Sequence, residues 1–343
     1  MDYQSYGQRR NGLWMLLGLI TISLALISGC GGSGSSGSSE SSGLTYSGST
    51  AQAEITEQNA SQLSANVMTV GSNSSAFDTI SLSENQTAGE NDSGPFIFPA
   101  MTAIIKDTVH QIDLSLPMPH DLSAALQTQS GTFNGDCATG DNGSASYSIQ
   151  VDDKTGVFSG NFEFSNFCVD ITVINGSTQF SGTVNVQTEE MQSFTLAFND
   201  LTVSSGELSF TFDGSIEMNL NSSEAGTTMN ILVRNDQTDD VYQVVDYSIS
   251  VTDNGSYEAI KISGTFYDPD NGYVTVSTPE PLLYENSATY PYSGRIVLTG
   301  AEGSTAQLTA VSATTCRLQV DADGDGTSEY DSGVILWREL GTN

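Results

Sequence analysis

Apolar and polar residues alternate along most of the chain after residue 131, and this alternation limits the fold more than any other feature. Runs such as Tyr147 to Val151, Leu208 to Phe212 and Tyr247 to Val251 have the two-residue period of strands with one buried face. Asn-Gly pairs, which suit tight hairpins, fall between such runs at 134/135, 142/143, 175/176, 254/255 and 271/272. No periodic helix of useful length interrupts residues 131–343, so we predict antiparallel strands without crossover helices.

A degenerate motif recurs in this region: an aromatic residue or Ile, then Ser or Asp, then Gly, any residue, and an apolar residue. Its glycines are Gly160, Gly182, Gly214, Gly264 and Gly294. Their spacing is too irregular for a strict solenoid or propeller but suits a meander with hairpins of varying length. Glycine inside a strand permits a bulge, a bend or an aromatic ring lying across it. We therefore predict a mainly β fold, a large curved antiparallel meander that forms a half-open barrel or a sandwich.

Two short helices are predicted before the strands. The first covers residues 55–70, with Thr56 as its cap and Ala60, Leu63, Val67 and Met68 on one face. The second begins at Pro99 and runs to about Asp113, with apolar residues on one side. Each helix needs a partner surface, so we expect residues 49–128 to pack on an antiparallel β domain that covers residues 129–343.

The first thirty residues carry the parts of a secretory signal. Arg9 and Arg10 precede an apolar run from Leu13 to Ile27, which is shorter than the ~20 residues of a membrane-spanning helix. The segment closes on Ile27-Ser28-Gly29-Cys30, which resembles the lipobox of bacterial lipoprotein precursors. That resemblance implies removal of a signal peptide (residues 1–29) and attachment of fatty acyl chains such as palmitate at Cys30. An uncleaved transmembrane helix and a twin-arginine export route are the weaker alternatives.

A tether follows the lipidation site. Residues 31–43 are Gly and Ser apart from Glu40, so they behave as a flexible coil with an r.m.s. reach of ~20 Å. We assign residues 30–48 to this tether. In lipoproteins of two-membrane bacteria, Asp directly after the lipidated cysteine marks retention in the inner membrane, and Gly31 stands there instead. The resemblance therefore implies an outer-membrane lipoprotein of the cell envelope, with the face of the membrane left open.

The chain is strongly acidic, with a formal net charge of −32. Removal of residues 1–29 takes away Asp2, Arg9 and Arg10, so the charge becomes −33. Nucleic acid and bare anionic lipid are excluded as partners because both are repelled at range. A solvated acidic surface is the first interpretation, beside adaptation to salt and binding of divalent cations.

Three cysteines remain once Cys30 is lipidated. We predict a disulfide between Cys137 and Cys168, because each lies near the end of a predicted strand and export permits oxidation. Cys316 is left over, and we interpret it as a buried apolar side chain.

The strongest chemical motif is Asp321-Ala322-Asp323-Gly324-Asp325-Gly326, followed by Glu329. Alternate aspartates in a glycine-bearing loop direct hard oxygens at one centre, as Ca²⁺ requires. The motif resembles the first half of an EF-hand loop, although Ser332 replaces the glutamate at the twelfth position and strands are predicted on both sides. We predict a Ca²⁺ site with side-chain ligands Asp321, Asp323, Asp325 and Glu329 and the backbone carbonyl of Thr327. A solvated acidic turn is the alternative.

The remaining polar features are weaker. Asp268-Pro269-Asp270-Asn271-Gly272 is a second candidate cation loop, but a plain hairpin turn explains it, and Asp152-Asp153 is interpreted as a turn. His110 and His120 have no second metal ligand at a recognisable spacing. The sequence contains no nucleophile elbow, phosphate loop or dinucleotide fingerprint.

These features predict a non-catalytic, lipid-anchored envelope protein with a Ca²⁺-binding C-terminal hairpin and a role in binding or assembly. One alternative is an envelope enzyme acting on glycans through acidic residues in a groove. The other is a carrier or chaperone of lipid or apolar polypeptide, whose curved sheet holds an apolar cavity.

Overall fold

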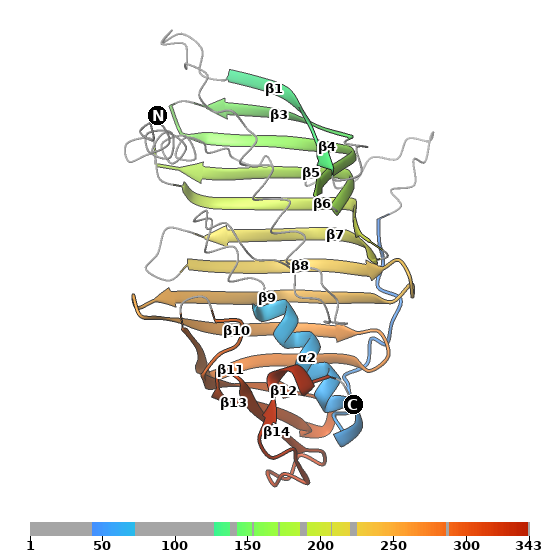
Figure 1. The fold of residues 1–343 in the computed structure, drawn as a ribbon, viewed down its shortest axis with the longest axis vertical. Helices are drawn as coiled ribbons and strands as arrows, with labels where there is room; N and C mark the ends of the chain where they lie inside the picture. The colour runs from blue at the N-terminus through green and yellow to red at the C-terminus, as the bar shows by residue number, and fades with distance from the viewer. Residues whose placement is uncertain are drawn as a thin grey trace, which may run out of the picture.

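The strands form one continuous sheet. The computed structural model describes residues 43–72, 127–137, 143–152, 154–170, 172–185, 191–206, 208–219, 225–285 and 288–341. Within these ranges sixteen strands belong to a single sheet, in the order β1-β3-β4 and then in sequence to β15, with β2 beside β4 and β16 beside β14. Figure 1 shows the strands stacked from β1 at the top to β14 at the bottom. The mainly β, antiparallel prediction is confirmed, and these strands form one open sheet instead of the two sheets of a sandwich.

The longest strands lie in the middle of the chain. Their bounds are β1 (Gln127–Asn134), β2 (Asp136–Cys137), β3 (Ser144–Asp152), β4 (Val157–Asp170), β5 (Thr172–Val184), β6 (Met191–Ser205), β7 (Leu208–Asn219), β8 (Ala225–Asn235), β9 (Val241–Asp253), β10 (Tyr257–Asp268), β11 (Gly272–Glu285), β12 (Ser293–Thr299), β13 (Thr305–Ser312), β14 (Thr315–Asp321), β15 (Tyr330–Asp331) and β16 (Ile335–Leu336). Pairing is antiparallel from β3 to β14, whereas β2 runs parallel to β4.

One face of the sheet is apolar across its whole width. Ile149, Phe180, Leu196, Ile216 and Met229 follow one another from β3 to β8 at successive register positions, with Gly160 between the first two. All five side chains are buried. The period-two alternation of the sequence is thus the alternation between this face and a polar one.

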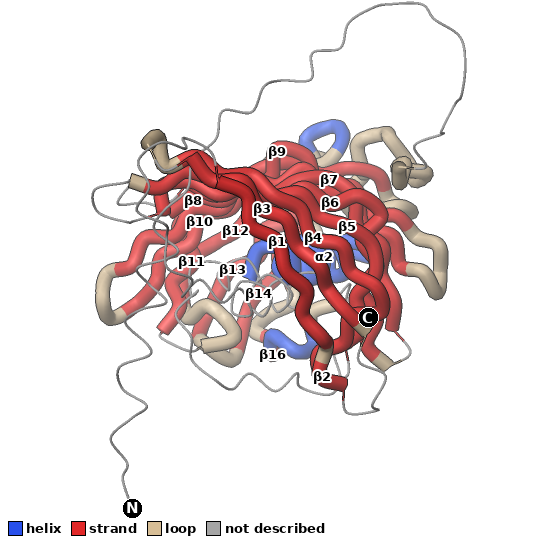
Figure 2. The backbone as a smooth tube through the Cα atoms, turned by 90° about the horizontal axis from the view of Figure 1, so that it is seen from above, coloured by secondary structure: helices blue, strands red, loops and turns tan. Residues whose placement is uncertain are grey.

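The glycine motif bends the sheet in two ways. At Gly160 the ring of Phe180 lies where a side chain would be, since a Cβ there would stand 2.3 Å from the ring. Gly264 has a φ of +139° and lies at a register break in β10, where a Cβ would stand 2.5 Å from the Tyr247 Cα on β9. Both the ring across a glycine and the bulge were expected of this motif, and Figure 2 shows the curvature of the sheet from above.

One Asn-Gly pair is not a turn. Asn175 and Gly176 lie inside β5 at a register break, and the Asn175 Oδ1 accepts a hydrogen bond from the Asn166 N–H of β4 at 2.7 Å. Our prediction of a hairpin there was wrong because a positive φ serves a bulge as well as a turn; Gly176 has a φ of +109°.

Helix α2 (Glu57–Ser72) is the first predicted helix, displaced by two residues. The predicted face is confirmed, because Ala60, Leu63, Val67 and Met68 are all buried. The Thr56 N–H donates to Asn59 Oδ1 at 2.8 Å, which closes the first turn. Figure 1 shows α2 lying across the sheet in its C-terminal half, where it packs on β10, β13 and β14.

Polar contacts fix α2 against the sheet at several points. The Tyr247 hydroxyl of β9 donates to the Val67 carbonyl at 3.2 Å, and the Asn66 amide donates to Asp268 Oδ2 at 3.3 Å. The Ile55 N–H donates to Ser304 Oγ at 3.1 Å just before the helix. Contacts with the sheet also occur within the predicted tether, where Tyr46 packs on the Tyr267 ring. The second predicted helix, from Pro99 to Asp113, lies outside the described residues, as does the whole segment between α2 and β1 (residues 73–126).

The structure brings Cys137 and Cys168 to disulfide distance, with their Cα atoms 5.2 Å apart. Cys137 ends β2, and Cys168 lies in β4. The connection between β1 and β3 is therefore joined to β4, as the positions of the two cysteines predicted.

Candidate metal centre

The acidic loop lies at the C-terminal end of the sheet. It leaves β14 at Asp321 and returns through Glu329 into β15, where Tyr330 pairs with Val320. The predicted hairpin is confirmed. Its second arm consists of two short strands, β15 and β16, which both pair with β14. Beyond the loop, Asp331 forms an ion pair with Arg317 of β14, and its pKa falls to about 2 through hydrogen bonds from Arg317 and the Gly333 N–H.

Two glycines turn the loop back on its first aspartate. Gly324 and Gly326 have φ values of +72° and +89°, and their N–H groups donate to the Oδ1 and Oδ2 of Asp321, each at 2.8 Å. Asp321 is buried, so its carboxylate is fixed by the fold instead of by solvent. The tight turn that glycine at these positions predicted is thus present.

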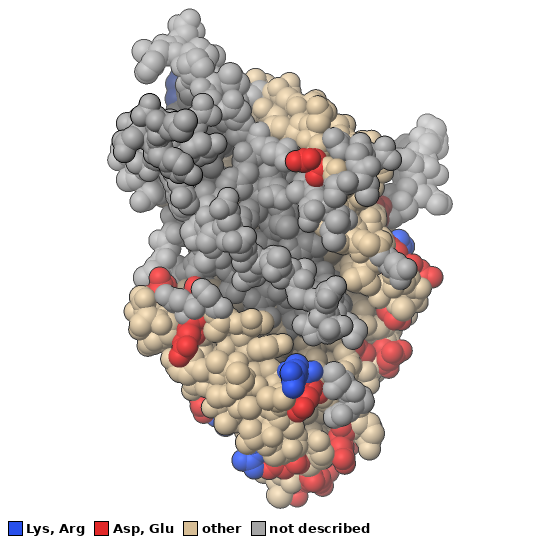
Figure 3. Space-filling view, in the orientation of Figure 1, with Lys and Arg blue, Asp and Glu red and all other residues tan. Residues whose placement is uncertain are grey.

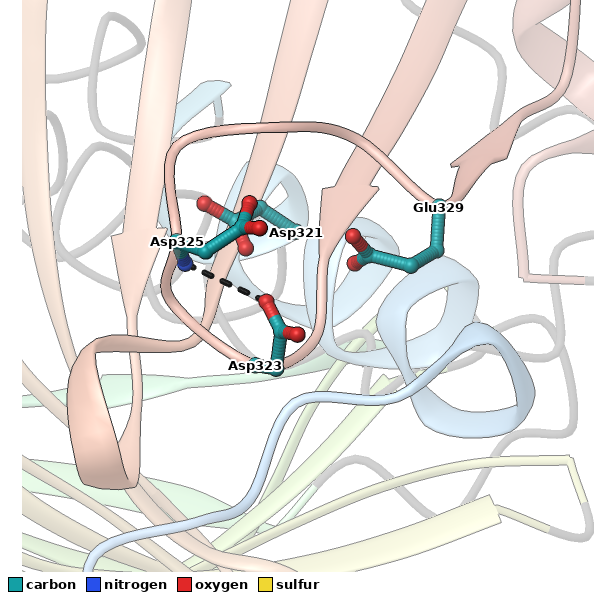
Figure 4. Close-up of side chains that lie close together, drawn as sticks. All are labelled: Asp321, Asp323, Asp325 and Glu329. Carbon is teal, nitrogen blue, oxygen red and sulfur yellow. Dashed lines mark hydrogen bonds between the residues drawn. The ribbon is translucent and has the colours of Figure 1, made fainter.

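The four predicted acidic ligands come together. One carboxylate oxygen from each of Asp321, Asp323, Asp325 and Glu329 lies within 4.8 Å of the others. Figure 4 shows these side chains pointing toward a common centre inside the loop. Asp321 is buried and the other three are exposed, so a cation bound here would keep one side open to water.

Backbone N–H groups orient the exposed carboxylates. Asp323 Oδ1 accepts the Asp325 N–H at 3.2 Å (Figure 4). Asp325 Oδ1 accepts the Thr327 N–H at 2.7 Å, and Glu329 Oε2 accepts the Ala322 N–H at 2.6 Å. Each bond uses one oxygen of its carboxylate. The second oxygens are the ones available to a cation. The backbone carbonyl of Thr327 as a further ligand stays a prediction.

The four carboxylates of the loop repel one another, and Coulomb's law gives the approximate energy of each pair. Two unit charges about 5 Å apart repel by about 1 kcal/mol in water and by more where solvent is excluded. Four carboxylates make six such pairs, so the loop's geometry is costly without a positive charge at its centre. Among the described residues this is the one cluster of three or more His, Cys, Asp or Glu side chains with metal-binding geometry.

The other acidic loop is a structural turn. Asp268 Oδ1 accepts the N–H groups of Asp270 and Asn271, at 3.2 and 3.0 Å, and Oδ2 accepts the Asn66 amide of α2. Asp268 thus holds a plain hairpin and anchors the helix, and among the described residues it belongs to no cluster of three or more possible metal ligands. Similarly, Asp152 caps its own turn through the N–H groups of Lys154 and Thr155. His110 and His120 lie outside the described residues.

Two polar features were not found from the sequence. Asp236 accepts hydrogen bonds from Ser209, Thr211 and Arg234; burial opposes its ionisation, but these bonds outweigh it and hold the pKa below the usual value. The second feature is the Asn66 link to Asp268. The first depends on strand register and the second on how α2 docks on the sheet, and no spacing in the sequence indicates which residues become neighbours.

Cys316 is buried, and burial, with a contribution from Glu339, raises the pKa of its thiol to about 12. It therefore stays a protonated, apolar side chain, as predicted.

Comparisons with known proteins gave no matching family model, no matching curated protein and no matching solved structure. Among the described helices, none has the length and apolar character needed to cross a bilayer.

Proposed function

We propose that this chain is a non-catalytic, lipid-anchored protein of the cell envelope, with a role in binding or assembly and a C-terminal loop that binds Ca²⁺. The observation that carries the proposal is the convergence of four carboxylates on one point in a loop turned by two glycines. The loop supplies hard oxygen donors and no nitrogen or sulfur, which favours Ca²⁺ over transition metals.

Calcium fits the loop better than magnesium. Ca²⁺ accepts six to eight oxygens at variable geometry, whereas Mg²⁺ demands a near-ideal octahedron and keeps most of its water. Three of the four carboxylates are exposed and lie on a loop, so their oxygens adapt to the larger ion. Extracellular calcium modules bind with Kd values of about 0.1 to 1 mM, a range that suits a partly open site.

A cation here stabilises the end of the sheet. Gly324 lies against the 3-10 turn η1 (Ala301–Gly303), because a Cβ on it would stand 2.7 Å from the Glu302 carbonyl oxygen. The Ala301 N–H in turn donates to the Ala53 carbonyl at 2.7 Å, in the segment before α2. The acidic loop thus contacts the η1 turn, and this turn binds the segment just before α2. We therefore expect a cation that orders the loop to stabilise the docking of α2 on the sheet.

The lipid anchor is supported by the lipobox at Cys30 and by the Gly/Ser run that follows it. Described residues just after that run contact the sheet: the Leu44 backbone N–H donates to Asp213 Oδ2 at 3.2 Å, and the Tyr46 hydroxyl donates to the Asp268 carbonyl at 2.8 Å. This arrangement suits a β domain held close to an outer membrane by acyl chains alone.

The non-catalytic assignment is supported by the buried acids. Among the described residues the buried carboxylates are Asp268 and Asp321, and each has both oxygens bound to N–H groups of the protein. A glycan hydrolase needs a pair of carboxylates, one of them free to exchange a proton. Both buried carboxylates instead accept hydrogen bonds that hold a turn or a loop in place.

A carrier of lipid or apolar polypeptide is the second candidate, and one observation favours it. Aromatic rings contact one another in series across β1 to β6 on the apolar face: Phe133, Tyr147, Phe162, Phe180, Phe158 and Phe194 form a connected set. However, Phe158, Phe162 and Phe180 are at most 6% exposed, which favours a packed core. Saturable binding of a fluorescent fatty acid by the purified chain would favour the carrier function over the proposed one.

The test of calcium binding is a pair of melting curves for the mature, lipidated chain in detergent, with 1 mM Ca²⁺ and with chelator. A Kd of about 0.1 mM raises the free energy of unfolding by about 1.4 kcal/mol at that concentration, or the Tm by about 3 to 5 °C. Replacing Asp321, Asp323 and Asp325 by Asn abolishes the difference.

The matched control replaces Asp200, Asp239 and Asp246 by Asn. It removes the same number of charges at sites outside the loop, and all three have positive φ values that Asn tolerates. The control is expected to keep the calcium-dependent shift. Identical melting of the native chain in calcium and in chelator refutes the proposal.

A further inference from the structure

Among the described residues, strand β1 is paired on one side only. All eight of its residues pair with β3, from Gln127 opposite Val151 to Asn134 opposite Ser144, without a register break. In the part of the chain that the structure describes, no strand lies beyond β1 (Figure 1). Every second residue therefore directs its N–H and C=O away from the sheet, which is the arrangement that accepts a further strand.

The opposite edge of the sheet is closed. Along β14, the short strands β15 and β16 pair with its two halves, and the ion pair between Arg317 and Asp331 ties β15 to it. Natural sheets protect edges with short strands and charges of this kind. In the described part of the chain, these devices are found at the β14 end of the sheet.

The β1 strand itself has no residue that would discourage pairing with another strand. Its sequence has no charged residue and no Pro, although the chain has a net charge of −32. The polar face of β1 and β3 beside this edge is uncharged until Asp152 at the end of β3, and it consists of Thr128, Ser130, Thr132, Asn134, Ser144, Ser146, Ser148 and Gln150. Figure 3 shows acidic side chains gathered toward the C-terminal end of the molecule and few on the described surface near β1.

The strand is also held in shape. The Tyr147 ring of β3 lies across Gly131, where a Cβ would stand 2.5 Å from it, and it stacks on Phe133 with centroids 5.1 Å apart. An aromatic ring over an edge glycine stabilises that strand. The Cys137 and Cys168 pair ties the end of β1 to β4. A preformed edge lowers the entropy lost when another strand adds to it.

We propose that β1 pairs antiparallel with β1 of a second copy of this chain, about a two-fold axis at Ser130. In this register Thr128 of one copy faces Thr132 of the other, and the exposed residues of both copies share one face. Two copies of so acidic a chain repel over most of their surfaces. At the uncharged β1 edge two copies can meet without this charge repulsion. A basic partner would instead be attracted to the acidic surfaces, so the uncharged edge favours a second copy.

Cysteine cross-linking in the envelope of a bacterial host tests the pairing on the full chain. A Ser130→Cys variant places two thiols opposite each other with Cβ atoms about 5 Å apart, so mild oxidation joins two copies. Ser148→Cys is the matched control, since Ser148 is the register partner of Ser130 on the same face. Its two copies lie about 14 Å apart, three strand spacings, and do not link.

Two further variants fix the register and separate pairing from folding. A mixture of Thr128→Cys and Thr132→Cys chains links at least tenfold more than either chain alone. When both chains of that mixture also carry Ser130→Glu, two carboxylates face each other at the two-fold axis. Their repulsion is expected to abolish the cross-link. Because Ser130 is exposed, the Tm of the Ser130→Glu chain stays unchanged. If Ser130→Cys links no more than Ser148→Cys, or links to a different protein, the pairing with a second copy is refuted.

Discussion

Gly264 offers a sharp test of how the sheet acquires its curvature. Its φ of +139° belongs to a region that only glycine enters without strain, and a Cβ would stand 2.5 Å from the Tyr247 Cα and 2.7 Å from the Asp246 carbonyl oxygen. Both obstacles are backbone atoms of β9, so a rotamer change does not relieve them. Gly264→Ala is therefore expected to distort the bulge.

The size of the effect follows from two contributions. Forcing a residue with a side chain into this region costs about 1 to 3 kcal/mol, and moving β9 away from the methyl group costs about 1 to 3 kcal/mol more. We expect Gly264→Ala to lower the free energy of unfolding by about 2 to 6 kcal/mol. Urea denaturation followed by circular dichroism measures this directly.

Gly226→Ala is the matched control. Gly226 lies in β8, its φ is not positive, and no atom lies within 4 Å of the added methyl group. This substitution is expected to change stability by less than about 1 kcal/mol, in the stabilising direction, by restricting the unfolded chain. Equal effects of the two substitutions would refute the reasoning that the bulge glycine is required by its backbone geometry.

Two further predictions concern the Cys137–Cys168 disulfide and the loss of stability at acid pH. Replacing Cys137 and Cys168 by Ser opens a loop with a sequence separation of 31 residues, and the chain-entropy relation gives a loss of about 3.7 kcal/mol, measured by urea denaturation; a loss below 1 kcal/mol would contradict it. For Asp236, the folded pKa lies below the unfolded one, so its stabilisation is present above the unfolded pKa, near 3.8, and disappears as the pH falls through the folded pKa. Between pH 5 and pH 3, Asp236→Asn is thus expected to lose less stability than the native chain in urea titrations, and parallel losses would exclude this role.

The sequence predicted local features and left their partners undetermined. Alternation identifies which side of a strand is buried, so the faces of α2 and of the strands followed from it. It does not say how many strands join one sheet. For this reason the sequence alone could not distinguish a half-open barrel from a two-sheet sandwich. The Asn175-Gly176 pair shows the same limit, because a positive φ is equally suited to a bulge and to a hairpin.

The convergence of the acidic loop was predictable because its four carboxylates are close in the sequence. Asp321, Asp323, Asp325 and Glu329 lie within nine residues, and the two glycines fix the turn that brings their oxygens together. By contrast, the contact of Asn66 with Asp268 joins residues 202 apart, and the Gly324 contact with η1 joins two separate hairpins. Such contacts depend on the tertiary fold, and no short motif indicates them.

Calorimetric titration of the mature chain with Ca²⁺ tests the central claim most directly. The account predicts one ion bound per native chain, one ion for the Asp200, Asp239 and Asp246 control, and no binding heat when Asp321, Asp323 and Asp325 are replaced by Asn. Absence of binding to the native chain at millimolar calcium, or equal binding to the variant that lacks the three loop aspartates, would contradict it.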